Sequence, residues 1–300
     1  MNKLIKVFRQ TFIYGIATVF PRIISVLLVR LHTDKDILES VSDYGSLSII
    51  FSYIILFNVI LSYGLETSFF RFFNKESNKQ EVISTASISI IFTTAIFFAI
   101  ASIFQVEISL FTGIETQYLE LVLWILALDA LVVIPFAYLR AKGQAIKYSL
   151  IKIINVVVYF SLNIILLILV KKFASVNDIA ATIYIPNYEI NYIFISNLIA
   201  SLVSLILLIP FYFKINYRIN IDLLKKMLMY AFPILISGLA YSINETFDKI
   251  LLDFMLPDSI AKSEIGMYAA CYKLALFMTL FSTAYKLGIE PFFFKEANEK

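Results

Sequence analysis

The sequence has very few of the residues on which most metal proteins and hydrolases depend. Its 300 residues include one cysteine, Cys271, and one histidine, His32. A single cysteine excludes a disulfide framework or a cysteine-based metal site within the chain. A single histidine argues against histidine-rich metal or acid–base chemistry. Charged residues make up 16% of the chain, whereas ordinary soluble domains contain about 25%, so the chain has too few polar groups to cover a soluble fold.

Apolar residues take the place of the missing charges. They make up 60% of the sequence, and the mean hydropathy is +0.84. We therefore expect an integral membrane protein. The formal charge of +3 comes from 25 Lys and Arg against 22 Asp and Glu, and this balance does not favour a nucleic-acid partner.

Long apolar stretches predict an all-α membrane fold with eight spans. A helix needs about 20 apolar residues to cross a bilayer. These windows are too long for barrel strands and lack the strict alternation of apolar and polar residues that such strands show. The predicted spans are residues 11–31, 44–70, 83–104, 118–138, 148–170, 190–213, 228–254 and 265–289.

The loops between these windows predict the orientation. Segments 1–10, 71–82, 139–147 and 214–227 carry 3, 3, 3 and 4 Lys or Arg, whereas the alternate connections together hold five. Lys and Arg accumulate in cytoplasmic loops. We therefore expect a cytoplasmic N-terminus.

The second and eighth windows resemble each other. Residues 64–70 (GLETSFF) and 288–294 (GIEPFFF) share Gly-x-Glu-x-x-Phe-Phe, and each begins 20 residues after a tyrosine, Tyr44 or Tyr268. Both copies run in the same direction, which predicts parallel repeats related by an axis along the membrane normal. The repeat predicts a complete six-helix lobe, 1–213, and an incomplete second lobe, 214–300. We therefore expect the chain to be truncated after its eighth helix.

Charged residues inside the windows are candidate functional residues, because a charge at the bilayer centre costs about 2.5–3.5 kcal/mol. Arg22 lies near the middle of the first window and Lys273 lies within the eighth. Either cation suits an anionic substrate group, although an ion pair inside the bundle is the alternative for Arg22. Asp129, midway along the fourth window, is a candidate partner for Arg22 or a proton or ion site.

The seventh window carries a polar stripe. Ser237, Tyr241, Glu245 and Asp248 are spaced by 4, 4 and 3, which places them on one face of a helix. Lys249 follows Glu245 by four residues, the order that favours an intrahelical ion pair. Glu245 and Asp248 against Lys249 leave one excess negative charge, which suits a coupling cation. The alternative is that these residues neutralise one another and have only a structural role.

Glu66 and Glu290 are related by the repeat. Both are expected at C-terminal helix ends, where the helix dipole disfavours a negative charge, and Arg71 and Lys295 are candidates to compensate it. They are predicted to act in gating or ion coupling, or to anchor the helices at the interface.

Motifs for enzymes are missing. There is no Gly-x-x-x-x-Gly-Lys-Ser/Thr phosphate loop. The segments between the predicted spans carry no nucleophile–base pair and no metal-ligand cluster. We expect a protein that is not an enzyme.

Several short motifs together resemble a known family. They are residues 43–45 (DYG), residues 64–66 (GLE) followed by Arg71, residues 138–141 (YLRA), residues 230–238 (YAFPILISG), and residues 248–249 (DK) followed by Leu251. The chain resembles the polysaccharide-export branch of the MOP flippase superfamily, which includes O-antigen and capsule flippases and is related to lipid II flippases and MATE transporters.

This resemblance implies a function. Members have 12 to 14 helices in two six-helix lobes around a central cavity that helices one, two, seven and eight line. They act in the bacterial inner membrane on an oligosaccharide linked to undecaprenyl pyrophosphate, and move it from the cytoplasmic to the periplasmic leaflet by alternating access. The lipid II flippases place cationic residues in helices one and eight, and Arg22 and Lys273 match these by helix. We expect Arg22, Lys273 and Tyr241 as substrate contacts, H⁺ or Na⁺ as coupling ion, a monomer among membrane lipids, and no cofactor.

The residues leave two alternatives open. One is a MATE-like, cation-coupled drug exporter. The other is a membrane enzyme of the same pathway, such as an O-antigen polymerase or an acyltransferase. The second alternative is disfavoured because the longest outer connection is only about 171–189 and His32 lies at a helix end.

Overall fold

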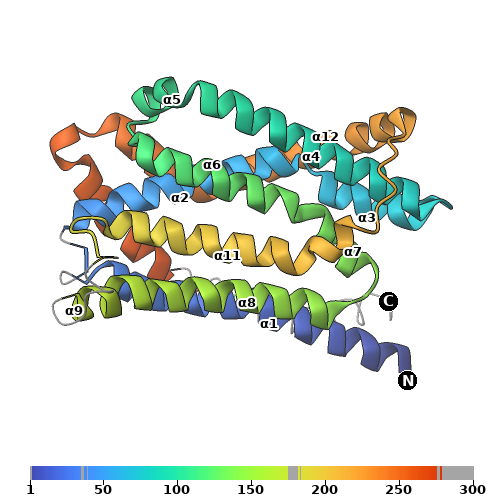
Figure 1. Ribbon diagram of the computed structural model, residues 1–300, viewed down its shortest axis with the longest axis horizontal. Coiled ribbons are helices and arrows are strands. Elements are labelled where there is room, and N and C mark those ends of the chain that lie inside the picture. Colours follow the sequence, from blue (N-terminus) through green and yellow to red (C-terminus); the bar gives the residue numbers. More distant parts are fainter. Residues whose placement is uncertain are drawn as a thin grey trace, which may run out of the picture.

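The computed structural model describes residues 2–34, 37–38, 40–174, 182, 184–275 and 278, and all of their side chains except those of residues 2–12 and 14. The elements assigned within these residues are all helical. The long helices lie side by side along the longest axis of the molecule (Figure 1). This is the arrangement expected when every backbone polar group must be paired within its own segment.

Seven helical segments are long and apolar enough to cross a membrane, which confirms an all-α membrane protein. The segments are Gly15–His32, Val41–Lys75, Lys79–Ile103, Thr116–Ala141, Ala145–Phe173, Glu189–Tyr212 and Ile221–Met255. They correspond to the first seven predicted windows. The eighth window, 265–289, falls partly outside the described residues; residues 258–275 are helical.

The labelled helices include those of the spans and the short connecting helix α5. They are α1 (Asn2–His32), α2 (Val41–Ser62), α3 (Leu65–Lys75), α4 (Lys79–Ile103), α5 (Gln105–Thr112), α6 (Thr116–Leu131), α7 (Val133–Ala141), α8 (Ala145–Ile164), the π-helix η1 (Ile165–Val170), α9 (Lys171–Phe173), α11 (Glu189–Tyr212) and α12 (Ile221–Met255).

Polar residues at the helix starts explain where several spans begin. Ser40 accepts a hydrogen bond from the backbone of Asp43, whose carboxylate accepts one from the Ser40 backbone, so α2 begins with a capping box. The Asn220 side chain accepts from the backbone N–H of Leu223 at 2.9 Å. Such caps satisfy backbone donors that have no partner within the helix. Asn220 therefore starts α12 seven residues before the predicted window.

The second predicted window is two helices rather than one. Tyr63 and Gly64 both have left-handed backbone angles, with φ of 33° and 70°, and they separate α2 from α3. A side chain at Gly64 would also meet the α12 backbone, since a Cβ at this position would lie 2.5 Å from the Ala231 carbonyl oxygen. Glycine fits both demands because it lacks a Cβ. The break places Glu66 in the first turn of α3.

Packing against α2 holds the last two described helices in place. The α12 helix packs along α2 and α3. Helix 258–275 crosses α2 where Gly45 and Gly266 face each other, and a methyl group on either glycine would collide with the backbone of the other helix. Small residues at such crossings allow the close backbone approach on which helix association in membranes depends. This crossing brings Lys273 and its neighbours beside α2.

Candidate functional site

The predicted stripe on α12 forms a polar surface. Ser237 and Tyr241 are exposed, and Glu245 and Asp248 are half-buried. The Tyr241 side chain is 66% exposed, and its hydroxyl donates to Glu245 Oε1 at 3.4 Å. The helical period thus places the four side chains as the spacing predicts.

Two tyrosines on helix 258–275 reach the two carboxylates. The Tyr268 hydroxyl donates to Asp248 Oδ2 at 2.5 Å, and the Tyr272 hydroxyl donates to Glu245 Oε2 at 3.2 Å. Their rings are stacked, with centroids 6.1 Å apart and planes inclined by 27°. We call the group the α12 polar cluster; it consists of Tyr241, Glu245, Asp248, Lys249, Tyr268 and Tyr272.

Lys249 pairs differently from the expectation. Its Nζ lies 3.1 Å from Asp248 Oδ1 and donates to the Glu245 carbonyl oxygen at 3.4 Å, so the predicted pairing with the Glu245 carboxylate is wrong. The ammonium also lies 4.4 Å from the Tyr272 ring centroid, a cation–π geometry. The Glu245 carboxylate accepts from the Tyr241 and Tyr272 hydroxyls, whereas the Asp248 carboxylate accepts from Tyr268 and from the lysine.

Lys273 lies one residue after Tyr272 but contacts other groups. Its Nζ is 5.6 Å from the ring centroid of the buried Tyr44. His32 Nε2 donates a hydrogen bond at 2.9 Å to Asn163 Oδ1, and the imidazole is close enough to Lys273 for their charges to interact. Lys273 therefore sits where α1, α2 and helix 258–275 approach one another.

Arg22 is exposed on α1. Its backbone carbonyl accepts from the Ser25 hydroxyl at 2.8 Å. The salt bridges found among the described side chains do not include Arg22, so the structure does not support the ion pair with Asp129 that was one interpretation of the sequence.

Asp129 has neutral partners instead. Asn58 Nδ2 donates to its Oδ2 at 3.3 Å, and the Ser201 hydroxyl donates to its Oδ1 at 2.7 Å. We call Asp129, Asn58 and Ser201, which come from α6, α2 and α11, the Asp129 cluster. Lys152 on α8 is near enough for its charge to act on Asp129.

Glu66 also differs from the expectation. It lies in the first turn of α3, where the helix dipole favours a negative charge, so the predicted C-terminal position is wrong. Its Oε1 lies 2.5 Å from Arg140 Nη1. Arg71, the predicted partner, instead places its guanidinium 4.2 Å above the Tyr230 ring.

Some of the predictions lie beyond the described residues. Glu290 and Lys295 are outside them, as is most of the second repeat copy. Within the described part of the chain, no group of three or more His, Cys, Asp or Glu side chains is placed to hold a metal ion.

Sequence reasoning missed Tyr268 and Tyr272 as members of the cluster. The repeat singled out Tyr268 for a different reason. The four-residue spacing of the two tyrosines, which places them on one helix face, was the available signal. The partner helix that this face meets was not visible in the sequence.

The helix arrangement matches that of a known class of membrane transporter. A solved structure described as the inward-facing conformation of a multidrug resistance MATE family transporter of the MOP superfamily is similar, with a TM-score of 0.56 and 15% sequence identity. The match covers 89% of this chain, and the chain spans 58% of the length of that transporter. At this identity the likeness shows a shared fold. No curated protein matches the sequence.

A family profile identifies the chain more closely. The profile described as "Polysaccharide biosynthesis protein" matches residues 6–287. The chain therefore belongs to this family of MOP flippases, which confirms the resemblance seen in the sequence motifs.

Proposed function

We propose that the protein is a flippase for a lipid-linked oligosaccharide. It moves an oligosaccharide on undecaprenyl pyrophosphate from the cytoplasmic to the periplasmic leaflet of a bacterial inner membrane, for O-antigen, capsule or exopolysaccharide synthesis. Its N-terminus is cytoplasmic, and it works by alternating access, as a monomer and without enzymatic chemistry, a cofactor or a nucleic-acid partner.

The α12 polar cluster carries this proposal. Two carboxylates, a lysine and three tyrosines meet between two helices of a strongly apolar chain, and Tyr241 and Tyr268 remain exposed at 66% and 40%. Polar groups within membrane spans normally face the bundle interior or a water-filled cavity. An exposed cluster of this kind is expected to line the transport path.

The chemistry of the cluster suits a sugar. The stacked Tyr268 and Tyr272 rings offer a flat apolar surface to the C–H face of a sugar ring, and aromatic rings combine such a face with a polar edge. Glu245 and Asp248 oxygens can accept hydrogen bonds from sugar hydroxyls. We therefore assign the oligosaccharide to this part of the path.

The pyrophosphate needs cations. Drawing such a group into a low-dielectric path is costly unless opposite charges compensate it. Arg22 offers a planar fork of donors that suits phosphate oxygens, and Lys273 offers a mobile point charge. We propose these two residues as the pyrophosphate contacts.

Coupling to H⁺ or Na⁺ would use the carboxylates. Glu245 and Asp248 outnumber Lys249 by one charge, and Asp129 accepts hydrogen bonds from two neutral donors. Glu66, with its partner Arg140, and Glu290 are proposed for gating. A cation-coupled drug exporter is the second candidate, which the likeness to a MATE transporter supports.

Reconstitution tests the proposal. Liposomes containing the complete protein and a fluorescent undecaprenyl-pyrophosphate oligosaccharide should expose the inner-leaflet sugar to a membrane-impermeant oxidant. Replacing Tyr268 and Tyr272 with Ala should slow this exposure about tenfold, from the loss of about 0.5–1.5 kcal/mol per aromatic contact. A matched control replaces the exposed aromatics Phe92 and Phe213 and should leave the rate unchanged.

The same liposomes distinguish the two candidates. Transport of a cationic dye with no movement of the oligosaccharide would overturn the flippase in favour of the drug exporter. Equal rates for the tyrosine variant and the phenylalanine control would remove the sugar from the α12 polar cluster.

A further inference from the structure

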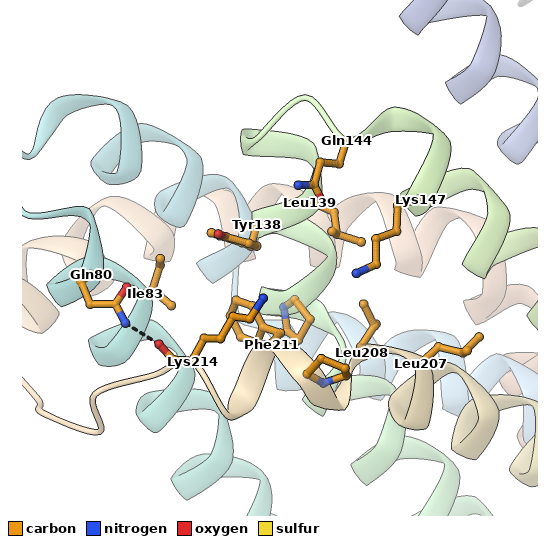
Figure 2. A pocket seen from close by; sticks show the side chains of 12 residues that line it. Gln80, Ile83, Tyr138, Leu139, Gln144, Lys147, Leu207, Leu208, Phe211 and Lys214 are labelled. Atoms are coloured by element: carbon orange, nitrogen blue, oxygen red, sulfur yellow. Dashed lines mark hydrogen bonds between the residues drawn. The ribbon is translucent and has the colours of Figure 1, made fainter.

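A pocket lies away from the α12 polar cluster, and none of the cluster's residues line it. It opens between the first turns of α4 and α8, the body of α7 and the last turn of α11 (Figure 2). The loop charges predict that these helix ends lie in the cytoplasm. Its cavity volume is about 160 Å³, roughly five times the 30 Å³ that one water molecule takes up in the liquid. The space is large enough for a phosphate group.

Two lysines supply the charge of this pocket. Figure 2 shows Lys147, from α8, and Lys214, just after α11, extending their ammonium groups into it from opposite sides. The residues that line it include no Asp or Glu. Neither lysine takes part in the salt bridges found among the described side chains. Two cations that have no acidic partner among the described side chains and that converge on one space favour an anionic ligand.

The polar wall of the pocket is preformed. Gln80 Nε2, in the first turn of α4, donates to the Lys214 carbonyl oxygen at 2.6 Å, and this bond holds the segment after α11 against α4. Gln144 and Tyr138 add neutral side-chain donors. The N-termini of α4 and α8 meet at the pocket, and a helix N-terminus carries a partial positive charge.

The floor of the pocket is apolar. Leu207, Leu208, Pro210 and Phe211 line it along the end of α11, and Leu207 and Pro210 are also exposed on the outside of the helix. A ligand that fits the whole pocket thus carries both an anionic group and a hydrocarbon chain. Free phosphate would leave the apolar floor uncovered.

We propose that this pocket binds the headgroup of an anionic phospholipid from the cytoplasmic leaflet. The phosphate lies between Lys147 and Lys214, and an acyl chain runs along the exposed end of α11. Basic pockets between transmembrane helices at the cytoplasmic surface are suited to anionic headgroups. Because the pocket spans α4, α7, α8 and α11, the bound lipid would tie together the ends of four helices.

Native mass spectrometry of the complete, delipidated protein tests this site. Titration with dioleoylphosphatidylglycerol should show one tightly bound lipid, and dioleoylphosphatidylethanolamine should bind more weakly. Replacing Lys147 and Lys214 with Gln should weaken the phosphatidylglycerol affinity about thirtyfold, at about 1 kcal/mol per lysine. Replacing the same two residues with Arg should preserve it.

The control removes two lysines elsewhere on the same predicted side. Lys225 and Lys226 are exposed in the first turns of α12 and do not line the pocket, so replacing both with Gln should leave the affinity unchanged. If the Lys147 and Lys214 double variant does not fold, the single Lys214→Gln change decides the matter, with an expected loss of about fivefold.

Three results would overturn the proposal. One is equal binding of the two lipids by the unaltered protein. Another is an equal loss of affinity in the Lys225 and Lys226 control. The third is displacement of the lipid by millimolar inorganic phosphate, which would make the pocket a site for the free anion.

Discussion

The two polar clusters of this membrane protein contain similar groups in different surroundings. The Asp129 cluster lies on the span Thr116–Ala141, in which 67% of an 18-residue apolar stretch is buried, whereas the α12 polar cluster lies on the span Ile221–Met255, in which 17% of such a stretch is buried. Asp129 is held by neutral donors from α2 and α11. The α12 carboxylates are held by a lysine and by tyrosines that remain partly exposed.

The difference teaches what each cluster is suited to do. A polar group within a packed bundle is costly unless its hydrogen bonds are satisfied, so a substitution there acts first on stability. A cluster on an open helix face loses little packing when it is altered. Substitutions in the α12 polar cluster should therefore act on transport with little effect on stability, whereas those in the Asp129 cluster should lower stability as well.

The largest expected effect comes from removing the two cations proposed to contact the pyrophosphate, Arg22 and Lys273. Replacing both Arg22 and Lys273 with Ala should abolish export, because the pyrophosphate would enter the transport path without compensating charge. Arg22→Lys should retain part of the activity, since a point charge replaces the planar fork. Complementation of a flippase-null strain, with surface polysaccharide as the readout, measures the effect.

Membrane abundance is the control for this pair of changes. The abundance should stay near that of the unaltered protein, because Arg22 is exposed. Normal surface polysaccharide from the double variant would show that these cations do not bind the substrate.

A smaller effect is expected in the Asp129 cluster. Asp129→Leu removes the acceptor for Asn58 and Ser201 and should lower the free energy of unfolding by about 1–3 kcal/mol. Asp129→Asn keeps one carbonyl acceptor and should recover much of this loss. Thermal unfolding in detergent measures both. Unchanged stability of Asp129→Leu would break the comparison, whereas lost transport by a stable Asp129→Asn variant would support the coupling role proposed for this carboxylate.

The sequence predicted the parts of this structure that depend on composition and helical period. Apolar length was enough for the first seven spans, because a bilayer fixes how long a helix must be. The spacing of Ser237, Tyr241, Glu245 and Asp248 was enough to place them on one face, since 3.6 residues make each turn.

The parts that depend on backbone angle or on a second helix were not predicted. The left-handed Tyr63 and Gly64 interrupt a continuous apolar window, and hydropathy carries no information about φ. Lys249 pairs with Asp248, while Glu245 accepts from Tyr241 on the same helix and from Tyr272 on helix 258–275, so tyrosines compete with the lysine for Glu245. Spacing within one helix could not reveal this competition.

A moderate loss of transport is expected from removing one hydroxyl of the α12 polar cluster. Tyr272→Phe deletes the donor to Glu245 Oε2 and keeps the ring beside Lys249. A typical intramolecular hydrogen bond contributes about 0.5–1.5 kcal/mol net, so the exposure rate of the oligosaccharide in liposomes should fall about threefold, less than in the variant that loses both tyrosine rings. The melting temperature should barely change. A large drop in melting temperature would make this tyrosine a structural residue, like those around Asp129.

The smallest effect is expected at the ion pair between Arg140 and Glu66. Their side chains are 42% and 40% exposed, and exposed ion pairs contribute about 0–1 kcal/mol to stability. Arg140→Gln should therefore leave the melting temperature nearly unchanged, and Glu66→Gln should match it, because both remove the same pair. The two variants differ in transport if Glu66 gates the path, since only one of them removes the carboxylate. Equal transport by both variants, at the level of the unaltered protein, would restrict this pair to a structural contact between α3 and α7. If either variant lost more stability in thermal unfolding than Asp129→Leu does, exposure would not separate structural from functional charges in this protein.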